Sequence, residues 1–311
     1  MEHDLPSEAF EQIAALGERL DRITDGLAEQ AAAITVPPTL FHYTNAEGLK
    51  GITESGRLRL SDIFNLNDPS EMRHGVTYAL NSLQQSAATG HRAAQLFAWR
   101  FSEHLGENLE GTSRQFVACF SPSGDDLSQW RAYADSGKGF ALGFDGPKLE
   151  EAFAVLSDLT ATLAVIYDEQ PIREAAEKIA TDALQVAEFP VGRGYDGPTL
   201  SAFLSALSVQ TSSAILHAAM LFKHPAYAVE REYRFLNVRS IENAEGIATA
   251  GNRSYIEFDW KSVGPHLLTQ IAIGPAADQR EARRFAEECL RSAGIDPRGV
   301  RIESSGIPYR G

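Results

Sequence analysis

The stretch Leu40–Leu60, LFHYTNAEGLKGITESGRLRL, holds the local signals that decide the fold. Its first residues favour a strand, Asn45 is a good helix N-cap, and Gly56 is suited to end the short helix that follows. The polar triplet His42-Tyr43-Thr44 therefore falls where a strand gives way to a helix. Ligands often bind at such points in open sheets, because side chains and helix N-terminal amides converge there. The triplet is a candidate binding motif whose partners must come from elsewhere in the chain.

Composition restricts the class of protein. With 311 residues and 43% hydrophobic content, the chain can bury a substantial core. A net charge of -14 opposes attraction of the whole surface to a nucleic acid. The two cysteines are far apart and fit no metal or disulfide spacing, the N-terminus is acidic, and no apolar run approaches the roughly 20 residues of a membrane span. We expect a cytoplasmic protein with no metal site and no membrane segment.

The N-terminal residues 1–36 are predicted to form an amphipathic helix, because apolar residues recur every three or four positions between Phe10 and Leu27. Pro37 and Pro38 end it. Residues 37–311 are predicted to form one α+β domain. The helix either docks on the core of this domain or forms a dimerising coil, since the same spacing suits a heptad seam.

Within the domain, patterns of period two alternate with patterns of period 3.6, which predicts strands alternating with helices. Residues 149–222 are mainly helical in pattern and are predicted to be an insertion on the sheet. The expected strands further include 114–120, 140–145, 163–167, a segment around 230–237, 254–260, 267–273 and 300–304; the expected helices include 69–83, 91–105, 127–134, 173–187, 200–221 and 278–292.

Two further polar clusters lie at predicted strand ends. One combines Ser121 with the segment Trp130-Arg131-Ala132-Tyr133, and the other is Glu230-Arg231-Glu232. Each has a plainer interpretation. A lone histidine beside a strand is most often structural, Trp130 has the spacing of a core residue, and the glutamates alternate with arginines as in a solvated cross-strand charge ladder.

From residue 40 onward, the chain resembles the bacterial family catalogued as domain of unknown function 2971. The motifs that carry the resemblance are His42-Tyr43-Thr44, Asn67-Asp68-Pro69, Cys119-Phe120-Ser121, Trp130-Arg131-Ala132-Tyr133, Phe222-Lys223-His224, Glu230-Arg231-Glu232 and Ile307-Pro308-Tyr309-Arg310.

The order of the three polar clusters also resembles the ADP-ribosyltransferase fold, the group that includes poly(ADP-ribose) polymerases. This resemblance implies a mixed, split β-sheet core and NAD as substrate. It implies that His42 binds the adenine-side ribose, that Tyr133 stacks on nicotinamide, and that Ser121 or Thr44 fixes the amide or ribose. Tyr43 stands where the related pattern usually has Gly, beside the nucleotide cleft. Arg131 is the candidate for the pyrophosphate, because guanidinium suits phosphate geometry.

Cleavage of the nicotinamide–ribose bond develops positive charge on the ribose, and a nearby carboxylate stabilises that charge. Glu232 is the first candidate for this task and Glu230 the second. We therefore expect an NAD-dependent ADP-ribosyltransferase, with a protein or nucleic acid as acceptor, or an NAD glycohydrolase if water is the acceptor; a toxin or defence role would suit this chemistry. The alternative is a non-catalytic nucleotide sensor or interaction module. A metal-assisted nuclease using Asp68, Glu71 and Asp145 is a third, weaker hypothesis.

Overall fold

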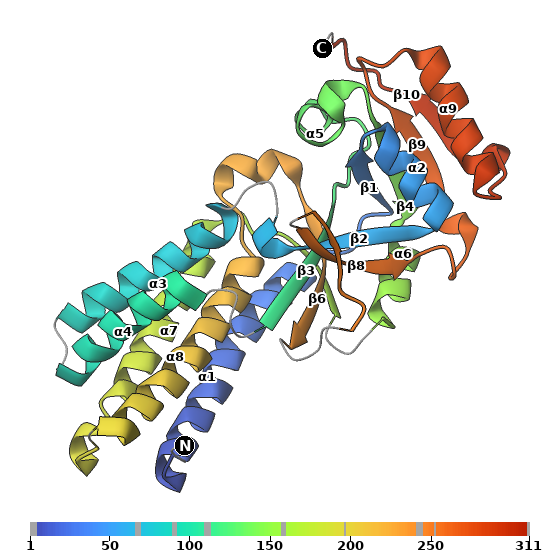
Figure 1. Cartoon of the computed structure of the whole chain (residues 1–311). Helices are drawn as coiled ribbons and strands as arrows, with labels where there is room; N and C mark the ends of the chain where they lie inside the picture. The colour runs from blue at the N-terminus through green and yellow to red at the C-terminus, as the bar shows by residue number, and fades with distance from the viewer. Residues whose placement is uncertain are drawn as a thin grey trace.

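The chain folds as an α+β protein with a bundle of long helices beside two β-sheets (Figure 1). This computed structural model describes residues 5–65, 70–88, 92–108, 113–156, 160–195, 197–240, 245–251 and 253–309. Within them, the strands form one four-stranded and one six-stranded sheet. The predicted α+β class is thus confirmed.

The four-stranded sheet has the order β1-β4-β9-β10, with β1 Thr39–Thr44, β4 Phe140–Asp145, β9 Leu268–Ile273 and β10 Arg301–Ser304. Its pairs are antiparallel except for β9 and β10, which are parallel. Three helices flank it: α2 Ala46–Ser55, α6 Gly146–Ala154 and α9 Gln279–Ser292. The caps expected for α2 are confirmed, since the Asn45 side chain accepts from the Gly48 amide and Gly56 has a φ of 70°.

The six-stranded sheet is antiparallel throughout, in the order β5-β6-β3-β2-β8-β7. Its strands are β2 Arg57–Asp62, β3 Ser113–Phe120, β5 Thr160–Ala164, β6 Tyr233–Ser240, β7 Ala248–Ala250 and β8 Arg253–Asp259. Both faces of β6 are buried, because Phe235 packs into the core shared with the other sheet and Leu236 packs into the core of the helices.

The helical bundle is built from α1 Ser7–Ala32, α3 Ser70–Ala88, α4 Arg92–Asn108, α7 Glu169–Ala187 and α8 Gly197–Met220 (Figure 1). The predicted insertion at 149–222 supplies only α7 and α8. Leu16, Leu20 and Leu27 of α1 are buried in the bundle. The N-terminal helix therefore docks on the core, and a dimer through it stays a prediction.

Helix α8 is, among the described residues, the one helix long and apolar enough to cross a membrane by length and composition. Half of its most apolar window is buried in the protein, where it packs against α1, α3 and α7. A core helix of a bundle passes the same test, so this observation establishes no membrane span.

Helix α3 begins at Ser70, close to the expected start at Pro69. The residues Asn67, Asp68 and Pro69 of that predicted helix start lie outside the described part of the chain, as does the side chain of Glu71. The other predicted elements appear within a few residues of their expected bounds. The exception is the strand expected around residues 230–237, which begins only at Tyr233.

Replacing Gly139 by Ala is expected to lower the free energy of unfolding by about 1–3 kcal/mol. The added Cβ would collide with the carbonyl oxygen of Thr44 and the backbone of Ala134, which hold the end of β1 against the start of β4. Gly51→Ala is the matched control. It lies exposed within α2 with no atom within 4 Å of an added Cβ, so it should stabilise by up to about 1 kcal/mol. Urea denaturation measures both, and equal effects of the two variants would contradict the packing argument.

Candidate functional site

The two sheets are joined at the point where the predicted motifs meet. Phe41 in β1 and Ser121 at the end of β3 exchange two backbone hydrogen bonds of 2.8 and 2.9 Å. Beside this bridge lies a cavity of about 310 Å³. Its walls come from β1, the end of β3, helix α5 (Leu127–Tyr133) and the segment between Lys223 and Glu232. A larger open groove of about 550 Å³ between α1 and α7 contains none of the predicted site residues.

Six of the eight predicted site residues line this cavity: His42, Tyr43, Ser121, Tyr133, Glu230 and Glu232. Thr44 and Arg131 do not. Thr44 lies at the end of β1 against Gly48, and Arg131 is exposed on α5. Asp145, proposed for a nuclease, instead caps α6 and pairs with Lys148 at 2.7 Å. No three His, Cys, Asp or Glu side chains gather as metal ligands in the described ranges.

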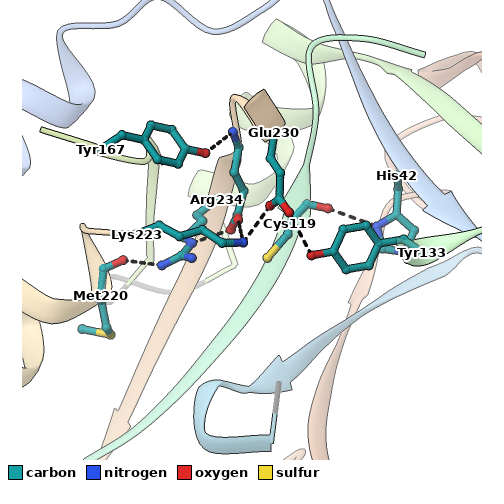
Figure 2. Close-up of polar contacts among 9 residues, drawn as sticks. His42, Cys119, Tyr133, Tyr167, Met220, Lys223, Glu230 and Arg234 are labelled. Atoms are coloured by element: carbon teal, nitrogen blue, oxygen red, sulfur yellow. Dashed lines mark hydrogen bonds and ion pairs between the residues drawn. The ribbon is translucent and has the colours of Figure 1, made fainter. Parts of the chain in front are cut away.

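Four buried charged side chains form a network at one wall of the cavity (Figure 2). Lys223 Nζ donates to Glu230 Oε2 at 2.7 Å and to Glu232 Oε2 at 3.0 Å. Arg234 Nε donates to Glu232 Oε1 at 2.5 Å, and its Nη1 donates to the carbonyl oxygen of Met220 at 2.8 Å. Glu230 is 7% exposed, Glu232 5% and Arg234 1%. The plainer interpretation of these glutamates as a solvated charge ladder is therefore wrong.

The backbone explains why both glutamates face inward. The short 3₁₀ helix η4, Pro225–Glu230, ends before β6 begins, and Arg231 between them has the left-handed conformation, with φ 46° and ψ 47°. This conformation costs a non-glycine residue about 1–2 kcal/mol. It leaves Arg231 exposed while Glu230 and Glu232 on either side are buried. The strain is kept at the cavity wall, where the ion pairs offset it.

Glu232 is held in its ionised form. Burial by itself would raise the pKa of its carboxyl group, but the charges of Arg234 and Lys223, with hydrogen bonds from the side chains of Arg234 and Cys119, lower that pKa from 4.5 to about 2. The Tyr167 hydroxyl accepts a hydrogen bond from the Glu232 amide at 2.9 Å. At neutral pH the cavity therefore contains a fixed carboxylate whose negative charge is balanced by buried cations.

This pKa predicts a loss of stability in acid. Because the folded-state pKa of Glu232 lies below its unfolded value, the carboxylate contributes stability above pH 4.5 that is lost as the pH falls toward 2. The shift corresponds to about 3 kcal/mol. Urea denaturation across this range should show the wild type losing about that much more stability than Glu232→Gln. Parallel curves for the two proteins would disprove the assignment.

His42 is a neutral hydrogen-bonding group. Its Nδ1 lies 3.2 Å from the carbonyl oxygen of Cys119, and its burial lowers its pKa despite that contact. Because a carbonyl only accepts, Nδ1 carries the proton and Nε2 is left as an acceptor. A neutral acceptor on the cavity wall suits a ligand hydroxyl; the predicted contact with a ribose stays a prediction.

Tyr43 in β1 links this strand to helix α5 through hydrogen bonds and a ring contact. Its hydroxyl donates to the carbonyl oxygen of Ser123 at 2.8 Å and accepts from the Asp126 amide at 3.1 Å, while its ring meets Trp130 edge-on at 4.8 Å. Trp130 is fully buried, as its spacing predicted, and packs with Ile307 near the C-terminus. The tyrosine that departs from the related pattern thus helps to place Tyr133.

The cavity residues that sequence reasoning did not identify as site residues include Lys223, Tyr227 and Gln129. Lys223 carries a sequence signal, because a lysine directly after the apolar run that ends in Leu221 and Phe222 indicates a buried charge. Tyr227 lies with its ring 4.9 Å from Lys223 Nζ, and Tyr133 donates to Glu230 Oε1 at 3.3 Å (Figure 2). No sequence signal marked Gln129, which is next to the core residue Trp130.

One part of the cavity lies in the segment of the chain that a family model recognises. Residues 129–235, which include Tyr133, Lys223, Glu230 and Glu232, match the model described as protein of unknown function (DUF2971). Neither the curated proteins nor the solved structures contain a match, so the resemblance to the ADP-ribosyltransferase fold stays a prediction. The match over residues 129–235, about a third of the chain, supports the DUF2971 family that the motifs indicated.

Proposed function

We propose that this protein breaks the nicotinamide–ribose bond of NAD, acting as an ADP-ribosyltransferase or, with water as acceptor, as an NAD glycohydrolase. One observation carries the proposal. Three motifs far apart in the sequence, around His42, Tyr133 and Glu232, line a single cavity that contains two buried carboxylates. The first two offer a hydrogen-bond acceptor and an aromatic ring, and the third offers a permanent negative charge.

The chemistry uses that charge. When the bond between ribose C1′ and the nicotinamide nitrogen breaks, its electron pair leaves with nicotinamide and the ribose becomes an oxocarbenium-like cation. An oriented carboxylate stabilises this cation more than the ground state. Glu232 is ionised at neutral pH because its pKa is near 2, and it lines the cavity. The acceptor nucleophile then forms a new bond to C1′ and releases its proton to the solvent.

The size of the cavity decides which part of NAD enters it. Its volume of about 310 Å³ is at the small end of the roughly 300–1,000 Å³ typical of sites that enclose drug-sized ligands. A whole dinucleotide exceeds it. The nicotinamide ring of NAD is cationic, so the half that bears this ring belongs beside Glu230 and Glu232. In this pose His42 meets the nicotinamide-side ribose rather than the adenine-side ribose that the resemblance implied, and the exposed Arg131 stays the candidate for the phosphates outside the cavity.

The test is release of nicotinamide from NAD by the purified protein, followed by chromatography with a broad set of protein, nucleic-acid and small-molecule acceptors. Ala132→Trp is the companion variant, because Ala132 is exposed on α5 and lines the cavity, so the larger side chain fills it without entering the core. We expect turnover by the wild type and none by this variant. A wild-type protein that neither binds nor consumes NAD would end the proposal.

A second candidate is a non-catalytic nucleotide sensor. It is favoured by the observation that both carboxylate oxygens of Glu232 already have buried donors, as in a structural network. Saturable NAD binding without release of nicotinamide, lost in Ala132→Trp, would select the sensor over the enzyme.

A further inference from the structure

The side chain of Gln129 makes no hydrogen bond to any other residue that the structure describes. Gln129 is 7% exposed. Its polar atoms are not among the fully buried ones that lack a partner, and the residue lines the cavity, so its two donor hydrogens and its acceptor oxygen stay accessible to a ligand. The position is well ordered by its surroundings, since the next residue, Trp130, is completely buried and donates to Asp125 at 2.8 Å.

The carboxamide belongs to the cavity. Gln129, Ala132 and Tyr133 are spaced i, i+3 and i+4, so they share one face of α5, and all three line the cavity. The polar groups of the charged network are occupied by one another, whereas Gln129 is a neutral group whose donors and acceptor are all uncommitted. A group of this kind can recognise, through hydrogen bonds, a ligand that presents both a donor and an acceptor.

We infer that Gln129 is a specificity-determining residue that pairs with the carboxamide of the nicotinamide ring. The inference rests on the proposed function for the identity of the ligand. A primary amide is complementary to another primary amide: the Gln129 N–H donates to the ligand oxygen, and the ligand N–H donates to the Gln129 oxygen. Adenine also offers such an edge. The carboxylates of Glu230 and Glu232 in the same cavity favour the cationic ring instead.

The experiment measures dissociation constants by calorimetry for three dinucleotides. They are NAD, 3-acetylpyridine adenine dinucleotide, in which a methyl group replaces the amide NH₂, and nicotinamide hypoxanthine dinucleotide, in which the adenine edge is changed. The wild type should bind NAD about 10-fold more tightly than the acetylpyridine compound, the value of one hydrogen bond. Gln129→Leu loses both hydrogen bonds, so it should weaken NAD binding by about 100-fold and acetylpyridine binding by about 10-fold, which abolishes this preference. In both proteins, the dissociation constant of the hypoxanthine compound should equal that of NAD.

Gln185→Leu is the matched control, since Gln185 is exposed on α7 and remote from the cavity. It should leave all three constants unchanged, and thermal unfolding checks that Gln129→Leu is folded. The inference is overturned if Gln129→Leu still binds NAD more tightly than the acetylpyridine compound. It is also overturned if the substitution instead alters the difference in affinity between NAD and the hypoxanthine compound. If the wild type prefers NAD and Gln129→Leu does not, but NAD is not cleaved, only the proposed catalysis is rejected. If NAD is cleaved but Gln129→Leu keeps the preference, only the role of Gln129 is rejected. If none of the three compounds binds, both are rejected.

Discussion

Arg234→Met is expected to lower the free energy of unfolding by about 3–5 kcal/mol, the usual effect of removing one partner of a buried ion pair. Arg234 is 1% exposed, and its guanidinium donates to Glu232 and to the carbonyl oxygen of Met220. Methionine fills a similar volume. It cannot donate to the carbonyl oxygen of Met220, and it removes one of the buried cations that balance the charge of Glu232. Urea denaturation of the two proteins measures the difference.

Two comparison proteins separate this effect from the loss of a positive charge. Arg284→Met removes an exposed arginine that pairs with Glu288 on α9, and it should change stability by less than about 0.5 kcal/mol. The double variant Arg234→Met/Glu232→Leu removes both charges and should be more stable than Arg234→Met alone. A double variant that is less stable than the single one would show that the two side chains are not coupled as the distances indicate.

The elements around the cavity were predictable where their signals are local. Asn45 and Gly56 bracket α2 as expected, and β4 has its predicted bounds, because caps, glycine turns and period-two patterns act over a few residues. The same reasoning failed at Glu230. An alternation of charged and apolar residues resembles an exposed strand, and only the left-handed backbone at Arg231 and the position of Lys223 make the alternation a buried network.

Local sequence patterns could not predict which helices form the helical bundle, for a related reason. Helix α1 carries a stripe that suits a core or a coiled coil equally, and the choice depends on α7 and α8, which are more than a hundred residues away. The charged network is closer in sequence, but it too depends on the three-dimensional path of the chain, since Lys223 follows α8, Arg234 lies in β6, and both donate to Glu232. Pairing between distant segments is information that periodicity does not contain.

Glu232→Gln is expected to lower the rate of nicotinamide release by about 10²–10³-fold with little change in KM, as for loss of one transition-state contact. Glutamine keeps the shape of the side chain and an oxygen that accepts from Lys223, but it has no charge. The cavity wall then carries an excess of positive charge beside the forming ribose cation. Glu230→Gln should have a smaller effect, about 10-fold, because Glu230 lies on the side of Lys223 that faces Tyr133 (Figure 2).

The rates of these two variants need two controls, one for the loss of a negative charge elsewhere in the protein and one for correct folding. Glu257→Gln provides the first control. Glu257 pairs with Arg57 at 2.8 Å on the six-stranded sheet and does not line the cavity, so its substitution should leave the rate unchanged. NAD binding by each variant provides the second, because a folded cavity that has lost only its charge still binds. A larger loss in Glu230→Gln than in Glu232→Gln would exchange their roles. Wild-type rates in both would mean that the buried charges serve stability alone, since a carboxylate that stabilises a cation cannot be neutralised without cost.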